Sequence, residues 1–184
     1  MCCDLYVACA RRWCQVRAEL RSMMDKREAA FHHAGHAVAT HLSDFHVLAA
    51  PLNIATYGNG EIVSALSRRK LTSAGKVADL SSRMDPQVAS GIAVILCAGL
   101  ASETLASELD LHVCVRRSMS AGDLALAKDE LRLAGLPDDT APYESAAKHL
   151  LSIHWAYVVS VADALLAEET IDPARVHELM PRPH

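Results

Sequence analysis

Two histidines one helical turn apart are the residues in this sequence best suited to chemistry. His32 and His36 are four positions apart. On a helix, side chains at this spacing project from the same face, so two imidazoles can bind one metal ion. The spacing predicts a metal site built on His32 and His36, and we expect the metal to be Zn²⁺.

His33 occupies the position between them that decides activity. In zinc peptidases with the pattern His-Glu-x-x-His, the glutamate is the general base. A neutral imidazole beside a dication is a weaker base than a carboxylate, because the metal's charge disfavours its protonated form. Three interpretations stay open: His33 replaces the base, His33 and His36 bind the metal at i and i+3, or activity has been lost. The last is favoured.

A helix must carry these histidines. Asp25 is a candidate N-cap, and Glu28 completes a capping box three residues later. Gly35 lies within the helix and predicts a close approach by another backbone or a bound group, since glycine otherwise weakens a helix. The alternating apolar residues of 45–66 around a turn at 57–60 predict a β-hairpin after it.

The rest of the chain is predicted to be helical. Expected helices cover 72–84, 86–108, 120–134, a long segment within 140–169, and 172–180. Asp85-Pro86 and Asp172-Pro173 each supply an N-cap followed by a proline in the first turn. The fold class is therefore mainly α (α+β), with a small hairpin or short sheet after the metal-motif helix.

Four segments together resemble the FtsH-type zinc metalloproteases, the ATP-dependent family that couples an AAA+ ring to a peptidase domain. Residues 30–38 resemble its His-Glu-Ala-Gly-His-Ala segment, and 98–103 are similar to its Gly-Arg-Ala-Ala-Glu turn, with Glu103 at the acidic position. Residues 120–124 fall where the family has Gly-Ala-x-Asn-Asp, and 162–171 are similar to its closing Leu-Leu-x-x-Glu-Thr-Leu helix. The matches keep the family's order from Met24 to Met180.

The resemblance implies a zinc-peptidase-like domain over residues 24–184, after an N-terminal extension at 1–23 that we expect to be helical. It implies Asp123 as the third metal ligand, although Gly122 replaces the asparagine before it. Ser120 and Asp123 also match a capping box that needs no metal. Glu103 either orients a ligand or forms an ion pair on a half-exposed face.

The function expected from this resemblance is that of a zinc metallopeptidase-like protein with weak or absent hydrolysis of peptides. The alternative is a non-catalytic pseudopeptidase that acts as an interaction or regulatory module. Its partner would be a polypeptide substrate or another protein, and a homo-oligomer is possible. We expect no ATP site, because the family's ATPase half and a Walker sequence are both missing here.

Composition excludes several other classes. The formal net charge of −4 disfavours nucleic-acid binding, so a regulator acting on an anionic ligand through Arg68-Arg69-Lys70 is a distant alternative. The longest apolar run, 91–101, is too short to cross a bilayer, which takes roughly 20 residues. With no signal-peptide pattern, a cytoplasmic location is expected.

Six cysteines without a Cys-x-x-Cys pair predict neither a zinc ribbon nor a disulfide framework. No role is assigned to the four at the N-terminus, which are Cys2, Cys3, Cys9 and Cys14.

Overall fold

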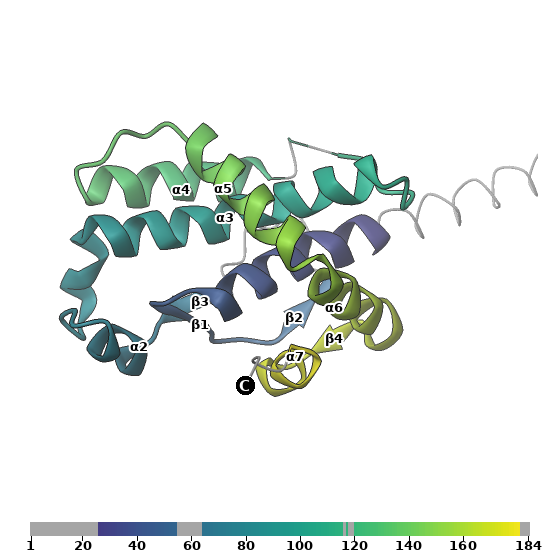
Figure 1. Cartoon of the computed structure of the whole chain (residues 1–184), viewed down its shortest axis with the longest axis horizontal. Coiled ribbons are helices and arrows are strands. Elements are labelled where there is room, and N and C mark those ends of the chain that lie inside the picture. The colour runs from purple at the N-terminus through teal and green to yellow at the C-terminus, as the bar shows by residue number, and fades with distance from the viewer. Residues whose placement is uncertain (1–25, 55–63, 116, 118–119, 181–184) are drawn as a thin grey trace, which may run out of the picture.

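The computed structural model describes residues 26–54, 64–115, 117 and 120–180. The N-cap expected at Asp25, the extension 1–23 with its four cysteines, and the turn at 57–60 lie outside these residues. A mainly helical architecture is confirmed, and helix 26–42 runs through its middle (Figure 1).

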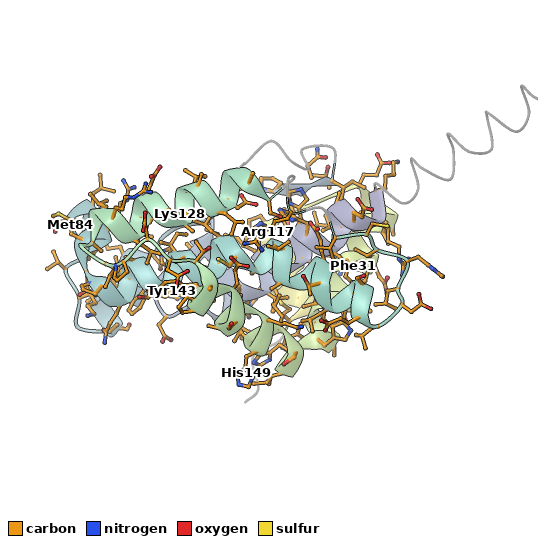
Figure 2. The ribbon with its side chains drawn as sticks, turned by 90° about the horizontal axis from the view of Figure 1, so that it is seen from above. Phe31, Met84, Arg117, Lys128, Tyr143 and His149 are labelled. Carbon is orange, nitrogen blue, oxygen red and sulfur yellow. The ribbon has the colours of Figure 1, made fainter. Side chains whose placement is uncertain are left out.

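Helix α3, Pro86–Glu108, is the centre of the helical layer. It packs against α4, Ala121–Leu133, and α5, Ala141–Ile153. In Figure 2, α4, marked by Lys128, runs along α3, whereas α5, marked by Tyr143, crosses α3 obliquely. A helix covered on several sides is expected to be apolar nearly all round, which explains the apolar run at 91–101.

The predicted N-caps are confirmed at the start of α3 and at the start of the last helix, α7, Pro173–Leu179. The Asp85 carboxylate accepts hydrogen bonds from the backbone N–H groups of Gln87 and Val88. The Asp172 carboxylate accepts one from Arg175. Because each cap satisfies helix N–H groups that lack a partner within the helix, both helices start where the sequence predicted.

The two ends of the expected hairpin pair as predicted, but the described strands form two separate two-stranded sheets. β1, His46–Leu48, pairs antiparallel with β3, Ser64–Leu66. β2, Leu52–Asn53, pairs instead with β4, Thr170–Ile171, near the C-terminus. A short antiparallel sheet formed by the two ends of 45–66 is therefore confirmed, whereas one continuous first strand over 45–55 was wrong, because Leu52–Asn53 forms a long-range pair.

The long helix expected within 140–169 is two helices. α5 ends at Ile153, and α6, Trp155–Glu168, leaves it at 86°. The two segments bury their apolar faces on different partners, since α5 packs on α3 whereas α6 packs on β4 and α7. Trp155 also stacks on Phe31 of helix 26–42, with ring centroids 5.8 Å apart, which draws the start of α6 away from the axis of α5.

The expected helix at 72–84 is also divided. α2, Arg68–Ser73, starts earlier and includes the basic triplet, and a 3₁₀ helix, η2, covers Leu80–Met84. Gly75 separates them at φ 70°, a left-handed conformation that ends a helix.

Within the described ranges, α3 alone passes the length and hydropathy test for a membrane span, and the bent α5–α6 pair passes it only as a broken span. Core helices of globular proteins pass the same test, and 72% of the apolar window of α3 is buried inside the protein. The absence of a span stays a prediction.

Candidate metal centre

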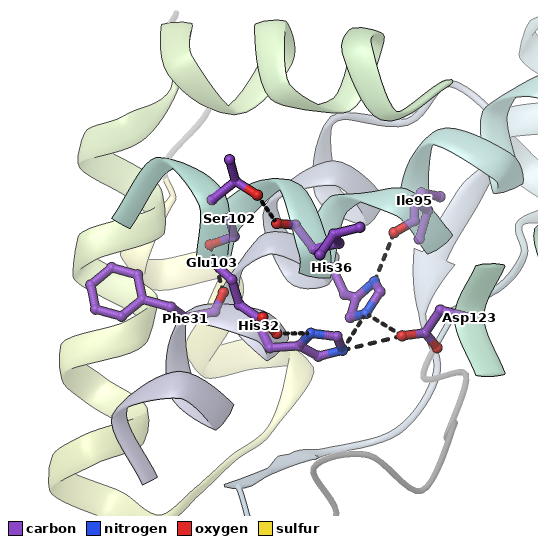
Figure 3. Close-up of polar contacts among 9 residues, drawn as sticks. Phe31, His32, His36, Ile95, Ser102, Glu103 and Asp123 are labelled. Atoms are coloured by element: carbon purple, nitrogen blue, oxygen red, sulfur yellow. Dashed lines mark hydrogen bonds and ion pairs between the residues drawn. The ribbon is translucent and has the colours of Figure 1, made fainter. Parts of the chain in front are cut away.

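His32 and His36 converge as their spacing predicts. Their Nε2 atoms lie 3.0 Å apart on the face of helix 26–42 that meets α3 (Figure 3). The rings are nearly perpendicular, at 77°, and both residues are buried. Two imidazole nitrogens able to bind a metal therefore point to one place inside the protein.

Asp123 reaches the same place from the first turn of α4. Its Oδ2 lies 3.2 Å from Nε2 of His32 and 3.5 Å from Nε2 of His36 (Figure 3). α4 brings it there by packing along α3, although Asp123 is far from both histidines in sequence. The structure thus brings together the three residues predicted as ligands.

The capping-box interpretation of Asp123 was wrong. Ser120 is the N-cap of α4, but its side chain makes no capping hydrogen bond. Its Oγ is buried and has no hydrogen-bond partner among the residues that the structure describes. The Asp123 carboxylate instead faces the two imidazoles.

A second layer of acceptors fixes the orientation of both rings. Nδ1 of His32 lies 2.7 Å from Oε1 of Glu103, and Nδ1 of His36 lies 2.7 Å from the Ile95 carbonyl oxygen. A carbonyl only accepts hydrogen bonds, so Nδ1 of His36 carries the proton and its Nε2 carries the lone pair. A carboxylate behind a metal-binding imidazole has the same effect and makes the ring a better ligand.

Glu103 is fully buried in α3. The expected half-exposed location was therefore wrong, and the contact with His32 that can orient its ring is present and buried. The sequence indicated this residue through the resemblance, whereas nothing in it marked Ile95, whose contribution is a backbone oxygen.

The contacts within this group shift the pKa values of His32 and Asp123. Burial alone would lower the pKa of His32, but hydrogen bonds with Asp123 and Glu103 outweigh it and raise the pKa to about 9. Burial would raise the pKa of Asp123, but hydrogen bonds with His32 and His36 hold it well below its usual value. A proton and a metal ion compete for the same Nε2 lone pair, so metal binding near neutral pH releases a proton.

The three atoms fit a metal ion. A tetrahedral ion about 2 Å from each ligand atom holds those atoms about 3.3 Å apart. The observed separations are 3.0, 3.2 and 3.5 Å. Two imidazoles and one carboxylate also leave a fourth position, as in catalytic zinc sites, although this donor set does not by itself identify zinc.

His33 lies beside this group but does not belong to it. Its ring is 5.7 Å from that of His32, and its Nε2 is buried with no hydrogen-bond partner in the described part of the chain. Burial, followed by the positive charge on His32 and His36, lowers the pKa of His33 to about 3. His33 is therefore neutral, and the structure gives no support to ligation through it.

Gly35 confirms the predicted close approach. A Cβ at this position would overlap the Ala98 carbonyl oxygen and lie 2.7 Å from Cβ of Ser102, both on α3. Ser102 also donates a hydrogen bond from Oγ to the Phe31 carbonyl, at 2.6 Å. Helix 26–42 and α3 thus meet backbone to backbone next to the histidines.

The basic triplet is not assembled as an anion site. Lys70 points inward, and its Nζ donates to the carbonyl oxygens of Ser43 and His46 at 2.5 and 2.7 Å. Its charge therefore stabilises the end of the loop after helix 26–42. A ligand role for the triplet would fall to the exposed arginines, Arg68 and Arg69.

Comparison of the chain with models of known protein families and with curated proteins finds no match.

Proposed function

We propose that this chain is a zinc-binding protein of the metallopeptidase type, with weak or absent hydrolysis of peptides. The observation that carries the proposal is the convergence of His32, His36 and Asp123, with Glu103 behind His32. These are the residues for which the resemblance to FtsH-type peptidase domains implies roles in one centre. Their convergence supports that resemblance.

In such a centre, the residues of this chain would have two roles, to bind the ion and to orient the ligands. His32, His36 and Asp123 would hold the ion, while Glu103 and the Ile95 carbonyl fix the imidazoles in the metal-binding tautomer. Zinc, when bound, acts as a Lewis acid on a carbonyl and lowers the pKa of water. The burial of these three side chains would strengthen every charge interaction at the site.

The general base is the weak part of the centre. An effective base has a pKa near the working pH, whereas the pKa of His33 is about 3. His33 is neutral at any physiological pH and accepts a proton poorly. This favours the second candidate function, in which a pseudopeptidase keeps the metal and binds a polypeptide or protein partner without cleaving it.

The test combines metal analysis with a peptide-cleavage assay on the wild-type chain, His33→Glu and His33→Gln. We expect one zinc per chain in all three. His33→Glu should raise the cleavage rate about 10²- to 10⁴-fold, the usual contribution of a general base, and His33→Gln should not raise it. Zinc without turnover in His33→Glu would favour the pseudopeptidase, and a zinc-free chain after loading would overturn the proposal.

A further inference from the structure

Gly99 lies on the face of α3 that meets the two imidazoles. A Cβ built on Gly99 would lie 2.5 Å from Cε1 and 2.7 Å from Nδ1 of His32. It would also lie 2.6 Å from Nε2 of His36, the atom that faces Asp123. Carbon and nitrogen atoms that are not bonded to each other do not approach this closely, so even one methyl group would displace both rings.

The neighbours of Gly99 on α3 hold the two rings close to this helix through hydrogen bonds. Ile95, Gly99 and Glu103 are spaced four residues apart and share one helix face. Ile95 accepts a hydrogen bond from His36, and Glu103 accepts one from His32. The face therefore presents an acceptor, a gap and a second acceptor on successive turns, and the gap is where the imidazoles meet.

The other described glycine of α3 is different. A Cβ at Gly91 would meet its nearest atoms, in Phe45 and His46, at 3.4 Å and beyond, which is ordinary van der Waals contact. The helix as a whole therefore does not require glycine. The requirement at position 99 is local to the histidine pair.

From this geometry, and resting on the proposed metal centre, we propose that Gly99 is a positioning residue: its missing side chain provides the space in which His32 and His36 converge on a metal ion. A side chain at position 99 pushes the two Nε2 atoms off the positions that one ion requires. Groups that act behind the ligands typically change metal affinity 10- to 100-fold.

The first experiment compares the wild-type chain, Gly99→Ala and Gly91→Ala after loading with Co²⁺, which reports its ligand geometry through visible absorption. We expect the wild-type chain and Gly91→Ala to give the spectrum of a tetrahedral site. Gly99→Ala should lose that spectrum and bind Co²⁺ about 100-fold more weakly. A methyl group with a purely structural effect would lower the melting temperature without changing the spectrum.

The second experiment needs no metal and remains informative if Gly99→Ala folds poorly. It introduces Gly99→Ala into the wild-type chain and into a His32→Ala/His36→Ala background, and compares the shifts in melting temperature. If the imidazoles are what the methyl group meets, the substitution lowers the melting temperature in the first background and much less in the second. Gly91→Ala should behave alike in both.

The outcomes separate this inference from the proposed function. A wild-type chain that binds no Co²⁺ overturns the metal proposal itself. A wild-type chain that binds it, together with a Gly99→Ala variant that binds it equally well, overturns the role of Gly99. Equal shifts of melting temperature in the two backgrounds also overturn it.

Discussion

Two buried histidines in this protein have opposite acid–base behaviour. His32, in the candidate metal centre, is 4% exposed, and His46, in β1, is 3% exposed. Hydrogen bonds to carboxylates outweigh burial and raise the pKa of His32 to about 9. Burial and the nearby charge of Lys70 lower the pKa of His46 to about 4. The burial is nearly the same, so the difference comes from the partners.

The comparison shows how the candidate metal centre differs from a histidine that is simply packed in the core. At His32 and His36, acceptors surround the rings, and two imidazole nitrogens and a carboxylate oxygen face one another, so this group attracts a cation, either a proton or a metal ion. At His46, the Ser43 hydroxyl lies 3.0 Å from Nδ1 and Lys70 is adjacent, so the site already has its donor and its cation.

The largest effect on zinc affinity is expected from removal of the Asp123 carboxylate, which faces the imidazoles. Asp123→Ala deletes a proposed direct ligand, which should cost more zinc affinity than the 10- to 100-fold typical of groups behind the ligands. We expect zinc affinity to fall about 1,000-fold, measured by competition with a chromophoric chelator. Asp129→Ala, an exposed position on the same helix, is the control. Equal loss in both variants would show that α4 as a whole, and not Asp123, is responsible.

The next effect concerns the acceptor behind His32. Glu103→Gln keeps the shape of the side chain but removes the negative charge that favours Nδ1 protonation and a basic Nε2. We expect zinc affinity to fall 10- to 100-fold, with the helical circular dichroism unchanged. Glu108→Gln, an exposed position on α3, should leave the affinity unchanged. Wild-type affinity in Glu103→Gln would mean that Ile95 and packing are enough to orient the rings.

The smallest effect is expected at His46, a buried histidine outside the candidate metal centre. Because the pKa of His46 is about 4 when folded and near 6.5 when unfolded, the unfolded chain binds the extra proton. The resulting stability is present above pH 6.5 and is lost as the pH falls toward 4. Between pH 7 and pH 5 the metal-free protein should lose about 2 kcal/mol of unfolding free energy through His46.

Urea unfolding at the two pH values measures this loss. His46→Gln should remove about 2 kcal/mol of the pH dependence, while the exposed His149→Gln should leave it unchanged. An unchanged pH dependence in His46→Gln would show that His46 is already charged in the folded protein, and the comparison between the two histidines would then be wrong.

Local patterns predicted the parts of this protein that depend on neighbours in sequence. The four-residue spacing of His32 and His36, the glycine between them and the Asp-Pro starts of α3 and α7 all follow from helix geometry. Asp123 could be placed only through the order of the resembling segments, because the packing of α4 on α3 brings it to the histidines.

Long-range packing decided the features that the sequence did not predict. The pairing of β2 with β4 joins segments more than one hundred residues apart, and no turn marks it. The bend at His154 accompanies the stacking of Trp155 on Phe31, a contact between segments far apart in sequence. The role of the Ile95 carbonyl also escaped prediction, because every residue has a carbonyl and only the fold selects one.

X-ray absorption of the zinc-loaded chain tests the central claim most directly. The account predicts one zinc per chain, with two imidazole nitrogens and at least one oxygen at about 2.0–2.2 Å, and loss of this first shell in Asp123→Ala. Sulfur ligands at about 2.3 Å would assign the metal to the cysteines and contradict the account. Failure of the folded protein to hold zinc would contradict it as well.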